Sequence, residues 1–124
     1  MTTTQAQRKA LGDFGERVAA RFLADLGMVV LDRNWRCPAG EIDIVALDCR
    51  ELVICEVKTR TNRRFGTPFE AITADKLARL RRLGYRWAEA HRGQVHYTRM
   101  RIDMVGVDAG SRGAASVEHV QAVA

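Results

Sequence analysis

Two acidic residues and a lysine on adjacent predicted strands have the spacing of a metal-binding group. The string GEIDIVALDCRELVICEVKTR (40–60) contains Asp43, Glu56 and Lys58. Side chains alternate between the two faces of a strand, so Glu56 shares a face with Lys58, and Asp43 shares one with Glu41. If the strands pair as a hairpin through the short polar segment between them, these charged groups converge on one face of a sheet.

Carboxylates placed in this way favour a hard divalent cation, because Mg²⁺ and Mn²⁺ prefer oxygen ligands. A lysine beside such an ion could orient or deprotonate water, or stabilise charge on a phosphate. The alternative is a solvent-facing pair in which Lys58 neutralises Glu56. Against it, Leu52 and Ile54 share the Glu56 face and residues 42–46 are almost all apolar. Charge in so covered a sheet is costly unless it is paired or metal-bound, and the residues alone leave both interpretations open.

Composition limits the class of protein. The 124 residues suffice for one domain, which we expect to span 1–124, and 20 basic against 15 acidic residues give a net charge of +5 that favours a polyanionic partner. Three widely spaced cysteines and no secretory leader predict reduced thiols in a cytoplasmic protein. The longest apolar runs are too short to span a bilayer, so we expect no membrane association.

Hydrophobic periodicity predicts an α/β fold in the order α-β-β-β-α-β, in which helices cover both faces of a mixed sheet of four or five strands. The expected helices are 5–26 and 73–91, and the expected strands are 28–35, 41–47, 51–59, 95–107 and, as a short last strand, 116–120. Thr73 is the expected N-cap of the second helix. Residues 1–4 and 108–114 are expected to be flexible.

The same periodicity predicts which helix residues enter the core. In the first helix Leu11, Phe14, Val18 and Phe22 recur at helical spacing, and we expect this stripe to face the sheet. Ala19, Leu23 and Leu26 widen it. Tyr85 in the second helix is expected in the core as well.

Beyond the spacing of single residues, GEIDIVALD followed by CEVKTR resembles the D…(D/E)-x-K core of restriction-endonuclease-like nucleases, the PD-(D/E)xK superfamily. Nearly the whole chain is similar to the YraN-like bacterial family of endonucleases, and in outline to archaeal Holliday-junction resolvases. The resemblance rests on GERVAARFLADLGM (15–28), NWRCPAGEIDIVA (34–46), ICEVKTR (54–60), FEAITADKLARL (69–80) and RIDMVGV (101–107).

That resemblance implies roles for four residues. Asp43 and Glu56 match the metal-binding carboxylates, Lys58 matches the catalytic lysine, and Glu16 matches an acid that the first helix adds to the metal site. It also implies a restriction-endonuclease-like α/β/α sandwich and Mg²⁺- or Mn²⁺-dependent hydrolysis of phosphodiester bonds in DNA. On helical geometry alone, Glu16 lies on the flank of the apolar stripe, where an exposed glutamate paired with an arginine is the alternative.

Basic residues near the predicted site are expected to contact the nucleic-acid backbone. Arg60, Arg63 and Arg64 occupy the loop after the CEVK strand, and Lys76 lies in the first turn of the second helix. Basic groups beside a metal site can hold the phosphates that flank a scissile bond. No segment is typical of a base-reading helix, so we expect selectivity for the shape of DNA rather than for its sequence.

Two further acids have expected supporting roles. Glu41 is expected to stand behind the metal ligands, where it could close the turn at Gly40 or accept a hydrogen bond from Arg60. Asp103 alternates with Arg101, which favours an intramolecular pair over a fourth metal ligand.

The leading interpretation is a nuclease acting on DNA in a branched or otherwise structured form; junction cleavage would call for a homodimer that presents two sites. Two other interpretations stay open at this stage. One is a nucleic-acid-binding module of recombination or repair that does not cut. The other is a protein-interaction domain in which the charged cluster is only structural.

Overall fold

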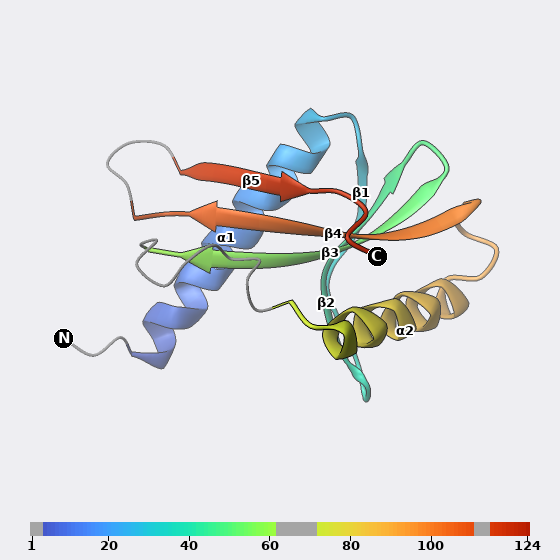
Figure 1. Cartoon of the computed structure of the whole chain (residues 1–124), viewed down its shortest axis with the longest axis horizontal. Helices are drawn as coiled ribbons and strands as arrows, with labels where there is room; N and C mark the ends of the chain where they lie inside the picture. Colours follow the sequence, from blue (N-terminus) through green and yellow to red (C-terminus); the bar gives the residue numbers. More distant parts are fainter. Residues whose placement is uncertain (1–3, 62–71, 111–114) are drawn as a thin grey trace.

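The computed structural model describes residues 4–61, 72–110 and 115–124. Seven elements of regular structure lie in these ranges (Figure 1). They are α1 (Gln5–Asp25), β1 (Val29–Cys37), β2 (Gly40–Asp48), β3 (Glu51–Arg60), α2 (Ala74–Ala90), β4 (Arg99–Asp108) and β5 (Ser116–Val120). The predicted segments are therefore confirmed, with most boundaries within a few residues.

The five strands form one mixed sheet in the order β1-β2-β3-β4-β5. Strands β1 to β3 make an antiparallel meander, β3 and β4 are parallel, and β5 returns antiparallel to β4. Parallel neighbours need a crossover connection, and α2 lies within the one that joins β3 to β4. The predicted α/β class with a mixed sheet is confirmed, and the optional short last strand is present.

The helices cover opposite faces of the sheet and create two cores (Figure 1). On the α1 face, Ala19 and Leu23 pack with strand residues that include Ile44, Cys55 and Val105. On the α2 face, helix residues pack with a different strand set, namely Leu80, Leu83 and Trp87 against Ile42, Val45, Leu52, Ile54 and Ile102. Central strands thus carry apolar residues on both sides, as covered strands must.

The buried face of α1 agrees with the predicted stripe at Ala19 and Leu23 but not at Phe14. Gly15, Ala19 and Leu23 are its buried residues, whereas Phe14 is 36% exposed. A Cβ atom at Gly15 would stand 1.7 Å from Oγ1 of Thr59, so only a glycine lets the helix lie this close to β3. The close approach at Gly15 took precedence over the larger apolar side chain of Phe14, so the centre of the buried face is shifted from the centre of the predicted stripe.

The second helix begins where its cap predicts. The Thr73 side chain accepts a hydrogen bond from the Lys76 amide at 3.1 Å. Leu80, Leu83 and Trp87 are buried, but Tyr85 is 53% exposed, so its assignment to the core was wrong. It lies one residue from Gly84, which faces the sheet, and so it projects from the side of the helix.

Asp103 lies in a buried polar network on β4. Its carboxylate accepts hydrogen bonds from Arg101 at 3.0 Å and from the Ala122 amide at 3.0 Å, and it lies 2.8 Å from Nε2 of His119. The predicted intramolecular pair with Arg101 is therefore confirmed. Asp108, which was expected to be flexible, is the last residue of β4 and pairs with Ser116, because the antiparallel return of β5 extends the ladder that far.

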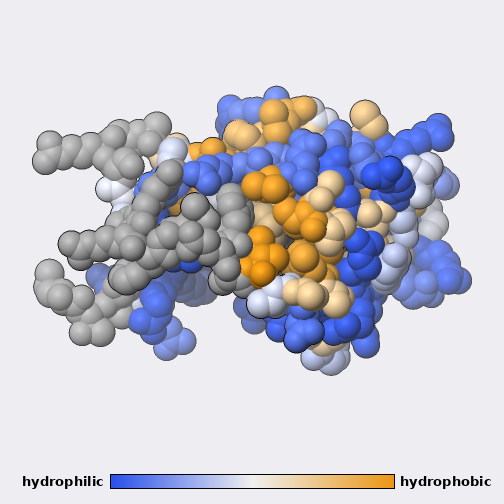
Figure 2. All heavy atoms as spheres, viewed as in Figure 1, coloured by the Kyte–Doolittle hydropathy of each residue, from blue (hydrophilic) through white to orange (hydrophobic). Residues whose placement is uncertain are grey.

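The surface is largely hydrophilic on the face viewed in Figure 2, with apolar atoms gathered near the middle of the sheet above α2. Tyr85, Val120 and Val29 are among the exposed large hydrophobic residues of the chain. Neither helix in the described part of the chain has the length and apolar character needed to cross a membrane.

Candidate functional site

A break in the β1–β2 pairing positions the first candidate acid. Arg33 pairs with Ile44 and Trp35 with Ile42, so Asn34 and Asp43 stand opposite each other between these pairs. Asn34 has a φ of 53°, a left-handed conformation that asparagine tolerates better than most residues. The strands twist here, because Ile44 packs under α1 whereas Ile42, only two residues away, packs under α2.

Simple strand alternation had placed these two isoleucines on one face, and that part of the prediction was wrong. The left-handed residue opposite Asp43 reverses the alternation at this point. The acids therefore do not form a row on one sheet face. Asp43 instead lies at the junction between the two faces, where it can meet groups from both sides.

The Asp43 carboxylate replaces backbone pairing between β2 and β3. The ladder between these strands ends at Ile44 and Cys55. Beyond that point the amide of Val57 donates a hydrogen bond to Oδ2 of Asp43 at 2.8 Å. An otherwise orphaned backbone donor is thereby satisfied, as buried amides require, and the carboxylate is fixed beside β3.

Asp43 carries an unusual protonation equilibrium. Burial, joined by the negative charges of Glu56 and Glu16, raises the pKa of Asp43 from 3.8 to about 7, although the hydrogen bond from Val57 opposes the rise. A hydrogen bond with Glu56 raises this pKa further, and such a bond between two carboxyl groups needs a proton on one of them. A cation that binds beside the Asp43 carboxyl group would therefore displace its proton readily near neutral pH.

Glu56 is the point at which two lysines meet. Its side chain is only 12% exposed, and Oε2 lies 3.8 Å from Nζ of Lys58 and in direct contact with Nζ of Lys76. Lys76 had been expected to contact the nucleic-acid backbone, whereas the structure directs its ammonium to Glu56. The N-terminal turn of α2, through its Thr73 cap, thus reaches over the end of β3.

Burial lowers the pKa of Lys58, and a hydrogen bond from Lys76 lowers it further, whereas the charge of Glu56 opposes the decrease. Lys76 behaves in the opposite way, since its hydrogen bonds to Glu56 and Lys58 outweigh the effect of burial and raise its pKa. The proton of the pair therefore resides preferentially on Lys76. Lys58 is therefore the lysine that gives up its proton more readily.

Glu16 approaches the site from α1. Burial raises the pKa of Glu16, the charge of Arg33 opposes the rise, and the charge of Glu41 adds to it. With its amide nitrogen turned toward the acids, Asn34 donates to Glu16 at 2.5 and 3.0 Å and reaches Glu41 at 3.3 Å. Sequence reasoning missed Asn34. Its position within β1 gave no signal, because the register that sets it opposite Asp43 is a tertiary property.

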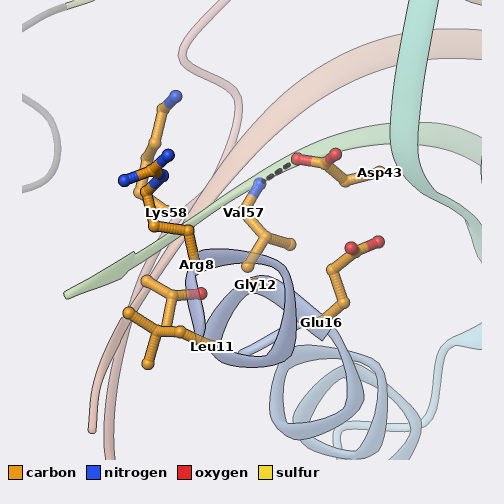
Figure 3. A pocket seen from close by; sticks show the side chains of 8 residues that line it. Arg8, Leu11, Gly12, Glu16, Asp43, Val57 and Lys58 are labelled. Atoms are coloured by element: carbon orange, nitrogen blue, oxygen red, sulfur yellow. Dashed lines mark hydrogen bonds between the residues drawn. The ribbon is translucent and has the colours of Figure 1, made fainter. Parts of the chain in front are cut away.

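One cavity of about 390 Å³ brings three of the four predicted site residues together. Glu16, Asp43 and Lys58 line it with Arg8 and Gly12. Figure 3 shows the carboxylates of Glu16 and Asp43 on one side and the cationic groups of Arg8 and Lys58 on the other, with Val57 between them. Glu56 does not line this cavity. It joins the group through its hydrogen bond with Asp43 and its contact with Lys58.

The remaining predicted residues lie at the margins. Glu41 pairs with Arg36 at 3.4 Å, not with Arg60, because Arg36 stands opposite it across the β1–β2 turn. Arg60 ends β3, two residues beyond Lys58, and its Nε atom is buried with no hydrogen-bond partner among the residues described. Arg63 and Arg64 lie outside the described residues.

The donor set at Asp43 and Glu56 fits a divalent cation in its chemistry. These two carboxylates repel each other in a covered setting, and a dication between them would relieve the repulsion that raises the pKa of Asp43. Within residues 4–61, 72–110 and 115–124, however, no three His, Cys, Asp or Glu side chains are already gathered as a metal-binding group. Ion binding would therefore draw the acids closer than they lie here.

Fold and site together define an α/β protein whose mixed sheet presents coupled carboxylates and two lysines beside a cavity under its first helix. The chain belongs to the family described as "Uncharacterised protein family UPF0102", whose model matches residues 15–107. A UPF0102 protein of Kineococcus radiotolerans is 55% identical over 116 residues, which are 94% of each chain. A UPF0102 protein of a Nocardioides species is 52% identical over 125 residues and covers 99% of each chain.

Proposed function

We propose that this protein is a divalent-cation-dependent endonuclease that hydrolyses phosphodiester bonds in DNA, with branched or otherwise structured DNA as the preferred form. One observation carries the proposal: a carboxylate with a pKa near neutrality and a lysine with a lowered pKa border the same cavity. Shifts of opposite sign in adjacent acidic and basic groups are characteristic of sites that bind cations or transfer protons.

Asp43 and Glu56 would hold the cation, and Glu16 would complete the acidic set from α1. When bound, a magnesium or manganese ion supplies a Lewis acid that offsets charge on the scissile phosphate. The chain's own contribution is positional. The amide of Val57 fixes Asp43, and Asn34 fixes Glu16, so both acids are oriented before any substrate arrives.

Lys58 is suited to accept a proton from the attacking water. In that step a water oxygen bonds to phosphorus and its proton passes to Nζ of Lys58. A phosphorus–oxygen ester bond breaks, and the leaving oxygen takes a proton from solvent, which gives an alcohol and a phosphate monoester. The lowered pKa of Lys58 supports this base role, because the neutral amine is easier to reach than in an ordinary lysine. Lys76 keeps the positive charge on the pair.

Plasmid and junction cleavage assays test the proposal. Purified protein is incubated with supercoiled plasmid and with four-way junctions in magnesium, manganese or chelator. Glu56→Gln and Lys58→Met should abolish cleavage. Glu89→Gln should retain it, because Glu89 is exposed and only pairs with Arg92 on α2. Cleavage that survives both site substitutions, or that ignores the chelator, would exclude this chain as the nuclease.

A DNA-binding module without cleavage is the second candidate. The observation that favours it is the Lys76 ammonium, which already neutralises Glu56 without any metal ion. This alternative predicts salt-sensitive binding of junction DNA that is unchanged by Glu56→Gln, together with no product in any cation. A homodimer with two sites would be needed for paired incisions in a junction, and light scattering of the protein with and without DNA would measure it.

A further inference from the structure

A glycine in the middle of α1 has no role in packing. A Cβ atom added at Gly12 would meet nothing within 4 Å. Glycine is less favourable than alanine inside a helix, because it loses more conformational freedom on folding. Gly15, one turn further along, is explained by its contact with Thr59. The fold gives no such reason for Gly12, which indicates that something outside the described chain uses the space.

Gly12 faces two cavities at once. The first is the cavity of Asp43 and Lys58 described above. The second measures about 370 Å³ and is lined by residues that include Lys9, Asn34 and Arg36. Gly12 and Glu16 are the two residues that line both. The two hollows therefore meet over Gly12, and together we call them the α1 groove.

Cationic side chains stand at each end of the α1 groove. Arg8 and Lys58 line its first half, and Lys9 and Arg36 line its second half. Lys9 pairs with Asp13 at 2.8 Å and Arg36 pairs with Glu41 at 3.4 Å, but the two cationic side chains are 76% and 78% exposed. Surface ion pairs of this kind are weak, so a phosphate can displace either carboxylate at little cost.

We propose that the α1 groove seats a single sugar–phosphate strand on both sides of the scissile phosphate and that Gly12 leaves its floor open for that strand. The inference rests on the proposed nuclease function and extends it to the path of the substrate. Arg8 would contact backbone phosphate on the Lys58 side, and Lys9 and Arg36 would contact it on the far side. Glu16 and Asp43 would then hold the centre, and the flanking phosphates would take the places of Asp13 at Lys9 and of Glu41 at Arg36, as a cleavage site between intact phosphates requires.

Gly12→Gln tests this path, because it places a side chain in the groove from a position where the added Cβ meets nothing within 4 Å. We measure affinity for a labelled four-way junction by fluorescence anisotropy in chelator, where no cleavage interferes, and cleavage with magnesium separately. Gly12→Gln should weaken binding by about tenfold while its thermal midpoint stays at or above that of wild type. Ala24→Gln is the matched control, since Ala24 is exposed on α1 and lines neither cavity.

A second variant tests whether a cationic side chain in the second half of the α1 groove contacts phosphate. Arg36→Gln should reduce the slope of log affinity against log salt by about one, as the loss of a phosphate contact requires. If Gly12→Gln binds and cleaves the junction like wild type, the groove path is overturned and the nuclease proposal survives. If Gly12→Gln weakens DNA binding but the wild-type protein never cleaves DNA, the nuclease proposal is overturned and the groove path stands. If the wild-type protein does not bind DNA but binds polyglutamate, a nucleic-acid strand is excluded as the occupant of the α1 groove.

Discussion

Replacing Asp43 by asparagine should make the protein more stable at neutral and alkaline pH. The change removes the charge whose burial raises the pKa of Asp43 to about 7. Asparagine has nearly the same size, its Oδ1 can keep the hydrogen bond from the Val57 amide, and its Nδ2 can donate to Glu56. The variant therefore resembles the protonated aspartic acid at every pH and isolates the cost of the charge.

The magnitude follows from the pKa difference. An increase from 3.8 to about 7 corresponds to about 4 kcal/mol, at about 1.4 kcal/mol for each pH unit. Because the pKa is higher in the folded state, the fold holds this proton more tightly than the unfolded chain does. The stabilisation is therefore complete below about pH 4 and is lost progressively as the pH rises through 7. Above pH 7 the free energy of unfolding of Asp43→Asn should exceed that of wild type by up to this amount.

Urea unfolding followed by circular dichroism at several pH values from about 4 to about 8.5 measures the difference. Asp25→Asn serves as the control, since Asp25 is exposed and pairs only with Arg21 at 3.1 Å, and its difference from wild type should stay small at every pH. Addition of magnesium should stabilise wild type but not Asp43→Asn. A free-energy gap between Asp43→Asn and wild type that is absent, or that does not grow with pH, would refute the assignment of a buried, charge-coupled carboxylate.

Three further measurements bear on the site and its scaffold. Lys76→Met should tighten magnesium binding severalfold in calorimetry, because it removes the ammonium that contacts Glu56. Arg86→Met on the same helix should leave the affinity unchanged. Equal affinities of Lys76→Met and wild type would contradict a competition between Lys76 and magnesium for Glu56. Asp103→Ala should lower the free energy of unfolding by about 1–3 kcal/mol in urea, since the Ala122 amide loses its acceptor while Arg101 keeps its pairs with Asp48 and Glu51. An unchanged free energy of unfolding would show that this buried network does not stabilise the fold. Gly15→Ala should be strongly destabilising because its Cβ would overlap the β3 hydroxyl, whereas a neutral result would mean that α1 does not lie so close to the sheet.

The regular elements could be predicted from the sequence because their signals are local. Thr73 caps its helix through an amide three residues away, and Gly27, with a φ of 98°, ends the first helix as a left-handed glycine should. The covered strands were also readable, since apolar residues on both faces of β2 and β3 leave little alternative. The order of the strands followed from short turns and one helical crossover.

The inward face of α1 was not predictable in the same way. Helical periodicity ranks faces by hydrophobicity, whereas the real interface was decided by how closely two backbones can approach. Gly15 against Thr59 allows a contact that no larger side chain permits. Phe14 was left half outside as a result, although by residue type it belonged in the core.

The sequence by itself determined which chemical groups the site could contain, since Asp43, Glu56 and Lys58 are fixed by their strand and spacing. Only the tertiary structure decided how they meet. The left-handed Asn34 turns β2 so that Asp43 reaches the Val57 amide, and Lys76 reaches Glu56 from α2, the helix on the face opposite α1. These contacts depend on register and on burial, and the pKa values that give the site its chemistry depend on them in turn. Residue type sets the charge that a side chain can carry, but its neighbours in space set the pH at which it carries it.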